Sequence, residues 1–382
     1  MKKQTQAYSM TDSSNNTSKA SPPTGGESIS KNIKNNQPNQ VAHNTGSSNR
    51  EFLAKEPIGK LLAKLALPTV AAQMINMLYN IVDRIYIGHI PQNGSLALTG
   101  VGVCMPLIMI ISAFAALVGN GGAPRATIYM GKNKKDDAEK ILGNCFTMQI
   151  ILSVILTAVL LIWNRDLLLA FGASKNTINY ATSYMNIYAI GTIFVQLTLG
   201  MNAFITAQGF AKEGMLSVLI GAIANIILDP IFIFALHMGV KGAALATIIS
   251  QGCSCIWVLS FLFGKRTTLR IRVKNLGLQA SYTLPCLALG SAVFIMQGSE
   301  SIISVCFNSS LLKYGGDMAV GAMTILTSVM QFAMLPLQGL GQGAQPIISY
   351  NYGAKNASRV KDAFKLLLKV SLTSVSYTHL TL

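Results

Sequence analysis

Long apolar stretches alternate with short polar segments along most of the chain. A transmembrane helix needs ~20 largely apolar residues, a length that nine stretches reach or approach. They cover residues 61–87, 98–118, 141–163, 180–207, 215–236, 242–263, 284–312, 319–340 and a ninth that begins near 364. Because a helix satisfies its own backbone hydrogen bonds in hydrocarbon, this pattern predicts an all-α protein that crosses a membrane many times.

The composition also favours a membrane location. Of 382 residues, 51% are hydrophobic and 12% are charged, with a mean hydropathy of +0.45. Soluble domains have roughly 25% charged residues. The net charge of +16 would suggest nucleic-acid binding on a soluble surface, but here Lys and Arg lie between and beside the apolar stretches. The charge therefore reports membrane topology, and we expect no nucleic-acid partner.

The basic residues also predict the orientation. They cluster between the second and third, the sixth and seventh, and the eighth and ninth stretches, and the alternate loops contain few. Since Lys and Arg are retained on the inner side, we expect a multi-pass plasma-membrane protein with a cytoplasmic N terminus. Residues 1–50 are rich in Ser, Asn, Thr and Gln without the apolar region of a signal peptide, which predicts a disordered cytoplasmic tail.

A basic segment at 265–280 follows six stretches and predicts a linker between two lobes. A shift of about 222 residues aligns GNGGAP at 119–124 with GQGAQP at 341–346, and Gly131 with Gly353. We therefore expect a six-helix lobe at 51–264 and a partial lobe at 281–382, related by an internal repeat. The ninth stretch turns polar after residue 371, so we expect a truncated chain with about nine of twelve helices.

Few ionisable residues lie inside the apolar stretches, where each one is costly and therefore suggests a function. Away from the loop ends they are Asp83, Arg84, Asp229 and Glu300. At ~1.5 Å per residue, Asp83 and Thr247 lie about 9 Å, and Asp229 about 12 Å, below the outer ends of their helices. Asn225 lies one turn deeper than Asp229 on the same face. Four polar groups are thus predicted to reach a similar depth.

Two carboxylates, an amide oxygen and a hydroxyl at one depth suit a proton or a hard monovalent cation such as Na⁺. Two carboxylates in a dry site repel each other, so we expect one of them to hold a proton near neutral pH. Alternatively, Asp83 faces lipid headgroups beside Arg84, and Asp229 caps a helix break before Pro230. Glu300 is a candidate for binding a cationic substrate or a second proton, or else it is a structural carboxyl group.

Motifs for nucleotide hydrolysis and catalysis are absent from the sequence. It contains no GxxxxGK[ST], HExxH or GxSxG motif, which would mark a phosphate loop, a zinc protease or a serine hydrolase. The six cysteines lie in apolar stretches without a CxxC pair, as expected of small buried residues. We therefore expect no enzyme activity, no metal cofactor and no ATPase subunit, so that transport draws on an ion gradient.

Over roughly residues 61–369, the sequence resembles the multidrug and toxic compound extrusion (MATE) family of transporters. The segments that carry the resemblance are YNIVDRIYIG at 79–88, NIILDPIFIF at 225–234, GAALATIISQ at 242–251 and QPIISYNYGA at 345–354. The resemblance implies twelve helices in two six-helix lobes, related by pseudo-two-fold symmetry, around a central cavity. It also implies export of small amphipathic, often cationic drugs in exchange for Na⁺ or H⁺.

The resemblance assigns roles to individual residues. It implies a first-lobe cation site formed by Asp83, Asn225, Asp229 and Thr247. Pro68 matches a proline that is proposed to bend its helix when that site is protonated, and Glu300 resembles an acidic residue of one branch of the family. The polar tail and the missing last three helices depart from the family pattern.

Two other functions remain open at this level. A lipid-linked saccharide flippase shares the two-lobe architecture, but it needs a strongly basic cavity to hold a pyrophosphate, and apart from Arg84 these helix interiors offer almost no Lys or Arg. A non-transporting membrane enzyme or receptor would need a catalytic cluster or a sensing domain, and the sequence shows neither.

Overall fold

The computed structural model describes residues 52–91 and 94–381, and all regular secondary structure in these ranges is helical, as predicted. The predicted tail at 1–50 lies outside the described residues. The elements in chain order are α2 (Ile58–Gly88), α3 (Gly94–Gly131), α4 (Lys135–Ala170), α5 (Ile178–Ile190), α6 (Thr192–Ala207), α7 (Ala211–Pro230), the π-helical turn η1 (Ile231–Ala235), α8 (Val240–Phe263), the 3₁₀ turn η2 (Val273–Asn275), α9 (Ala280–Gly353) and α10 (Ala357–Thr381).

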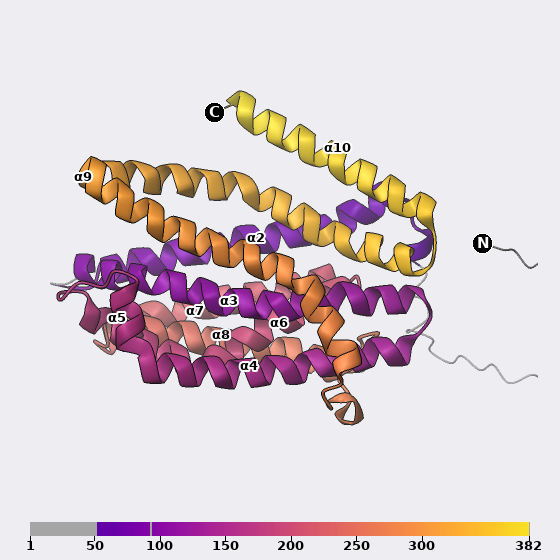
Figure 1. Ribbon diagram of the computed structural model, residues 1–382, viewed down its shortest axis with the longest axis horizontal. Helices are drawn as coiled ribbons and strands as arrows, with labels where there is room; N and C mark the ends of the chain where they lie inside the picture. The colour runs from indigo at the N-terminus through magenta and orange to yellow at the C-terminus, as the bar shows by residue number, and fades with distance from the viewer. Residues whose placement is uncertain (1–51, 92–93, 382) are drawn as a thin grey trace, which may run out of the picture. The chain divides into compact units, whose positions relative to one another are not determined.

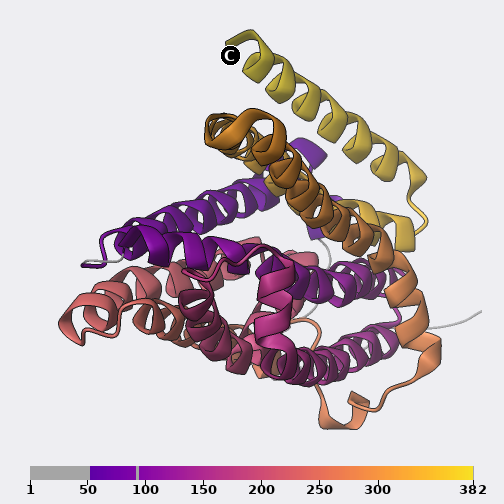
Figure 2. The ribbon, with the colours of Figure 1, turned by 60° about the vertical axis from the view of Figure 1, so that its left-hand side comes forward.

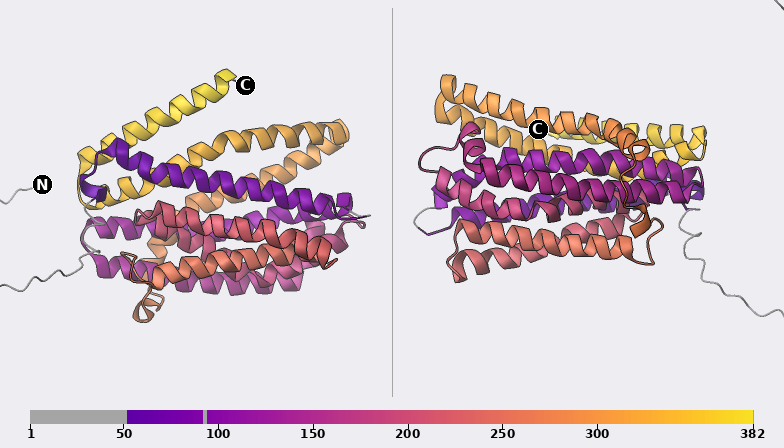
Figure 3. Two further views of the ribbon diagram at one scale, coloured as in Figure 1. Left: turned by 180° about the vertical axis from the view of Figure 1, so that it is seen from behind. Right: turned by 60° about the horizontal axis from the view of Figure 1, so that its bottom comes forward.

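The long helices lie side by side, with α9 and α10 on one side of the bundle formed by α2 to α8 (Figures 1, 2 and 3). Within the described ranges, six helices are long and apolar enough to cross a membrane, and the α5–α6 pair makes a seventh. The eighth and ninth predicted stretches lie in the remainder of α9 and in α10. A multi-pass membrane fold is therefore confirmed.

The fourth predicted stretch, 180–207, is not one continuous helix. It consists of α5 and α6, which meet at Gly191 with a bend of 58°. A β-carbon on Gly191 would overlap the Ile248 side chain of α8. The close approach of α8 therefore requires glycine at the bend, which the hydropathy pattern alone could not reveal.

The seventh and eighth predicted helices are the two arms of α9, which folds back on itself (Figure 1). In a straight helix, Cys286 and Tyr350 would be about 96 Å apart at 1.5 Å per residue. Instead, the backbone of Cys286 lies against Gly121 of α3, and that of Tyr350 lies against Gly131, near the end of the same helix. We call the arm of α9 that contains Cys286 the outgoing arm, and the arm that contains Tyr350 the return arm.

Glycines of the repeated motif make close contacts between the first half (α2 to α8) and the second half (α9 and α10). Gly131 packs against the backbone of Tyr350 and Gly353, and Gly353 packs against the backbone of Ile128. Because Gly131 and Gly353 occupy equivalent positions of the repeat, their mutual contact places the pseudo-two-fold axis between them.

A second pair of equivalent glycines packs in the same way. Gly121 of α3 contacts Cys286 and Gly290 of the outgoing arm, and Gly343 of the return arm contacts Ala66 of α2. The repeat shift of about 222 residues maps Ala66 onto position 288. This position lies between Cys286 and Gly290, the two residues that Gly121 contacts. The pseudo-symmetry predicted from the sequence is therefore present in the packing of the two halves.

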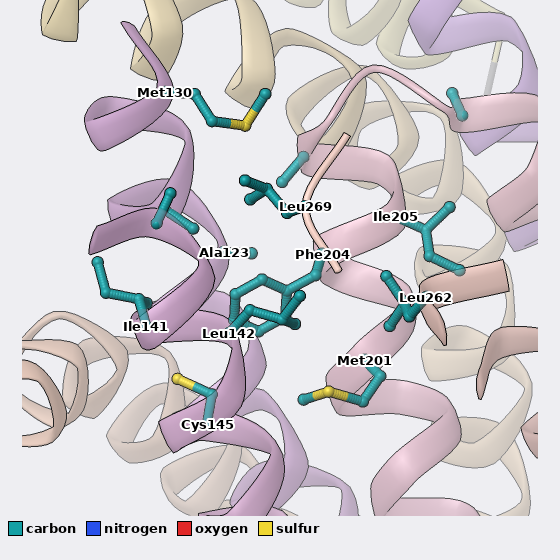
Figure 4. Packing of buried hydrophobic residues seen from close by; sticks show 14 of the residues in the cluster. Ala123, Met130, Ile141, Leu142, Cys145, Met201, Phe204, Ile205, Leu262 and Leu269 are labelled. Atoms are coloured by element: carbon teal, nitrogen blue, oxygen red, sulfur yellow. The ribbon is translucent and has the colours of Figure 1, made fainter. Parts of the chain in front are cut away.

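Apolar side chains form two clusters along the bundle. One lies at the end that carries η2, which we call the linker end, and Phe204 is at its centre, surrounded by Leu142, Met201 and Leu262 (Figure 4). The other lies toward the opposite end of the bundle and contains Ile87 and Ile233, each one turn after a predicted site residue.

The contact of Gly343 with α2 can be tested with a matched variant two residues away. Gly343→Ala places a methyl group against the backbone of Ala66, whereas a β-carbon on Gly341 would meet nothing within 4 Å. We expect Gly343→Ala to cost about 1–3 kcal/mol through overpacking and to lower the melting temperature in detergent. Gly341→Ala should leave it unchanged or raise it, and equal melting temperatures for the two variants would contradict this packing.

Candidate functional site

The fold brings Asp83 of α2 together with Asp229 of α7. Both carboxyl groups are buried, with exposed fractions of 7% and 0%. They lie close enough to interact directly with each other. Arg84, the next residue in α2, is exposed, so its side chain points away from the buried carboxyl group of Asp83.

Aromatic packing holds α2 beside the end of α7. The Tyr86 ring meets the Phe234 ring edge-on, with 6.3 Å between the ring centroids. Phe234 lies in the π-helical turn η1, which follows Pro230 directly. Proline has no backbone N–H, so the helical hydrogen-bond ladder is interrupted next to Asp229. Such π-turns are frequent at functional sites.

Asn225 completes the buried group on α7. Its Nδ2 donates a hydrogen bond of 3.2 Å to Oδ1 of Asp229, one helical turn away. Only 2% of Asn225 is exposed. The one-turn spacing read from the sequence thus places the amide directly on the carboxyl group.

Three oxygen atoms of this group have no hydrogen-bond partner in the described part of the chain. They are Oδ1 of Asp83, Oδ1 of Asn225 and Oδ2 of Asp229, and all three are buried. A buried polar atom without a partner typically costs about 1–3 kcal/mol. A proton or a hard cation could bind to these carboxylate and amide oxygens and supply the partner that they lack.

Thr247 of α8 joins the group through a tyrosine. Its hydroxyl donates a hydrogen bond of 2.9 Å to the Ala243 carbonyl oxygen, and the Tyr184 hydroxyl lies close to the Thr247 side chain. Tyr184 of α5 is only 2% exposed, and its hydroxyl is close enough to Asp83 to feel the charge of that carboxylate. Sequence reasoning missed Tyr184, because nothing in its own stretch indicates that α5 packs against this site.

A cavity of about 40 Å³ lies beside the carboxyl pair, between α2, α6, α7 and α8. Its volume is enough for a water molecule or a small ion. Amide, hydroxyl and apolar side chains line it, with no Lys or Arg among the lining residues, which are Asn76, Tyr79, Thr198, Leu199, Val218, Gly221, Ala222, Asn225, Thr247, Ser250, Gln251 and Ser254. Tyr79 lies one turn before Asp83, so helical spacing could have identified it.

Two other predicted residues lie elsewhere. Glu300 is exposed on the outgoing arm of α9 and does not line this cavity. Pro68 is buried within α2, about 22 Å before Asp83 along the helix. It lies at the contact with the return arm of α9, where the hydroxyl of the next residue, Thr69, donates a hydrogen bond of 2.6 Å to the Gly339 carbonyl oxygen.

Comparison with known proteins agrees with this architecture. The MatE family model matches residues 68–231 and 292–379. Over 317 residues the chain is 26% identical to the multidrug export protein MepA of Staphylococcus haemolyticus, an alignment that covers 83% of this chain and 69% of that protein. The MepA protein of Staphylococcus aureus is 25% identical over 319 residues, with the same coverage.

Solved structures share the fold. An outward-facing multidrug resistance MATE transporter of the MOP superfamily matches with a TM-score of 0.79 and 25% identity, covering 85% of this chain and 72% of that one. A second match is a MOP superfamily transporter from Pyrococcus furiosus, with the same TM-score and identity. The alignment covers 85% of this chain and 71% of that one. Its binding pocket is described as having reversed polarity, which suggests a different function.

The helical bundle and its apolar spans define a multi-pass membrane protein. The family model covers well over half of the chain. The chain belongs to the MatE family.

The contact between positions 83 and 229 can be tested by cross-linking. With the native cysteines replaced, Asp83→Cys and Asp229→Cys should be joined by a short bifunctional thiol reagent, because their side chains meet in the bundle. The pair Asp83→Cys and Glu300→Cys is the control, since Glu300 is exposed on α9. Equal cross-linking of both pairs, or none at 83 and 229, would contradict the site geometry; mass spectrometry of the digested protein provides the measurement.

Proposed function

We propose that this protein is a secondary antiporter that exports small amphipathic, often cationic drugs in exchange for a cation bound at Asp83, Asn225, Asp229 and Thr247. Its MepA relatives are multidrug export proteins by name, which supports drug export. The main support for the cation site is the interaction of two buried carboxyl groups. Two of their oxygen atoms, and the amide oxygen of Asn225, have no hydrogen-bond donor in the described part of the chain. The N terminus is proposed to face the cytoplasm, as the basic loops predict.

The geometry favours a proton over Na⁺ as the coupling ion. Two carboxyl groups in direct contact cannot both be ionised without strong repulsion, whereas one shared proton makes their contact a hydrogen bond. Na⁺ needs several oxygen ligands around it, which would require the two carboxyl groups to move apart. We propose that release of the shared proton and drug binding favour different states of the transporter, which is all that exchange requires.

Cavity polarity distinguishes this function from that of a lipid-linked saccharide flippase. A flippase pocket must attract a pyrophosphate, and Lys or Arg would supply that attraction. The lining of the described cavity contains neither. The Pyrococcus furiosus transporter, with its reversed pocket polarity, illustrates that pocket charge can differ within one architecture. The cavity beside the carboxyl pair admits only a water molecule or a small ion, so its lining bears on the cation site. The scarcity of Lys and Arg in the apolar stretches supports export of neutral or cationic compounds over transport of a pyrophosphate-linked lipid.

The proposed cation site can be tested by ethidium efflux from cells that express the intact protein. Asp229→Asn and Asp83→Asn should each reduce gradient-driven efflux by about tenfold or more, because an amide cannot exchange a proton at this position. Asp166→Asn, which removes an exposed carboxyl group from α4, should leave efflux unchanged. Undiminished efflux by a correctly inserted Asp229→Asn protein would remove the proposed site.

The coupling ion can be tested separately in vesicles that contain the purified protein. An imposed pH gradient without Na⁺ should drive dye transport, and an imposed Na⁺ gradient at equal pH should not. Transport driven by Na⁺ alone would overturn the assignment of the proton and leave the antiport proposal intact. The Asp166→Asn protein serves as the active control in both gradients.

A further inference from the structure

A short turn before the first long helix bridges the two halves of the molecule. Residues 52–55 form one helical turn, closed by a hydrogen bond of 3.0 Å from Glu56 N to Phe52 O. Pro57 then ends the turn, and α2 begins at the next residue. We call residues 52–56 the N-terminal strap.

The sequence of the strap leaves its carbonyl groups without helical donors. The Leu53 carbonyl would normally accept a hydrogen bond from the N–H of residue 57, but Pro57 has no N–H to give. Leu53 is fully buried, so its carbonyl oxygen requires another donor. A buried carbonyl at a helix end without a partner is strongly disfavoured.

The second half supplies these donors. Asn351, in the last turn of α9, donates its Nδ2 to the Leu53 carbonyl oxygen at 3.1 Å. Nη2 of Arg359, in the first turn of α10, lies 2.7 Å from the Glu56 carbonyl oxygen and 3.3 Å from that of Leu53. The positive guanidinium thus caps the carbonyl end of the turn, a favourable charge for a helix C terminus.

The other side of the strap is held by the first half. The Phe52 ring lies against Gly209, in the loop between α6 and α7, where a β-carbon would overlap the ring. Gly209 has φ of +91°, so both its backbone conformation and the ring contact favour glycine. Lys64 of α2 lies over the same ring, 4.6 Å from the centroid, and forms an ion pair of 3.1 Å with Glu56.

Asn351 and Arg359 are themselves held in place. Asn351 is 1% exposed and also donates to the Ile347 carbonyl oxygen at 2.8 Å. The Arg359 backbone N–H donates to Oδ1 of Asn356, just before α10, at 3.3 Å, as an N-cap residue would accept it. The donors of the second half are therefore positioned before they meet the strap, which suits a contact that breaks and reforms.

We propose that the N-terminal strap and Arg359 form a latch that holds the two halves together at the linker end. This inference rests on the proposed function, because an exporter must open this end to load its substrate. The halves cannot separate here without losing either the Arg359 and Asn351 hydrogen bonds or the Phe52 contact with Gly209. The latch stabilises the state in which this end is closed.

The test measures separation of the halves directly, in the absence of drug and ion gradients. Spin labels on cysteines at Lys212 in α7 and Lys361 in α10, both exposed positions, report the distance between the halves in a background without native cysteines. Arg359→Met keeps much of the side-chain bulk and removes the charge and the donors. We expect it to increase the population with separated labels by about tenfold, the effect of losing a charge-assisted hydrogen bond.

Control variants separate the latch from general destabilisation. Arg270→Met removes an arginine that bonds Lys265 in its own loop, and it should leave the distances unchanged. Arg359→Lys should partly restore the closed population. Phe52→Ala, which acts on the opposite side of the strap, should also increase separation.

The latch would be overturned if Arg359→Met, folded with an unchanged melting temperature, kept the distance distribution of the parent protein. If Arg359→Met does not fold, Asn351→Ala and Phe52→Ala decide the question, and unchanged distances in both would reject the latch. Because no transport is measured, failure here leaves the cation site of the proposed function untouched, and loss of efflux by Asp229→Asn leaves the latch untouched.

Discussion

The contact between the carboxyl groups of Asp83 and Asp229 is the interaction on which the functional interpretation of this fold depends. An ionised carboxylate is costly inside a membrane span, and two in contact repel each other. The bundle nevertheless buries both, and it leaves nearby oxygens without donors. A shared proton or cation would relieve this repulsion, so in the proposed mechanism the occupancy of the site and the distance between α2 and α7 are linked.

Helix α2 connects this site to the contacts between the halves. Asp83 lies toward one end of α2, and the N-terminal strap leads into the other. Between them, Thr69 bonds the Gly339 carbonyl oxygen at 2.6 Å, and Gln73 bonds Gln342 at 3.1 Å. A shift of α2 relative to α7 would therefore act directly on the contacts with α9, which would connect the proposed ion exchange physically to the contacts between the halves.

The contacts between the halves rely on backbone approach more than on side-chain chemistry. Gly131 and Gly353 meet on the pseudo-two-fold axis, and Gly343 admits the backbone of α2. In hydrocarbon, where the hydrophobic effect does not drive helices together, small residues allow the close packing that holds them. Because the strap bonds through its carbonyl groups, it too depends on backbone geometry, with Pro57 removing the donor that would otherwise compete.

The sequence by itself predicted the helices, the internal repeat, and Asp83, Asn225, Asp229 and Thr247 as the candidate site. These follow from local rules, because hydropathy and the 3.6-residue period act within one helix. Only the tertiary structure decided the bend at Gly191, the place of Tyr184 and the contacts of Arg359. Each depends on a side chain or backbone from another helix, and a one-dimensional pattern carries no information on which helices meet.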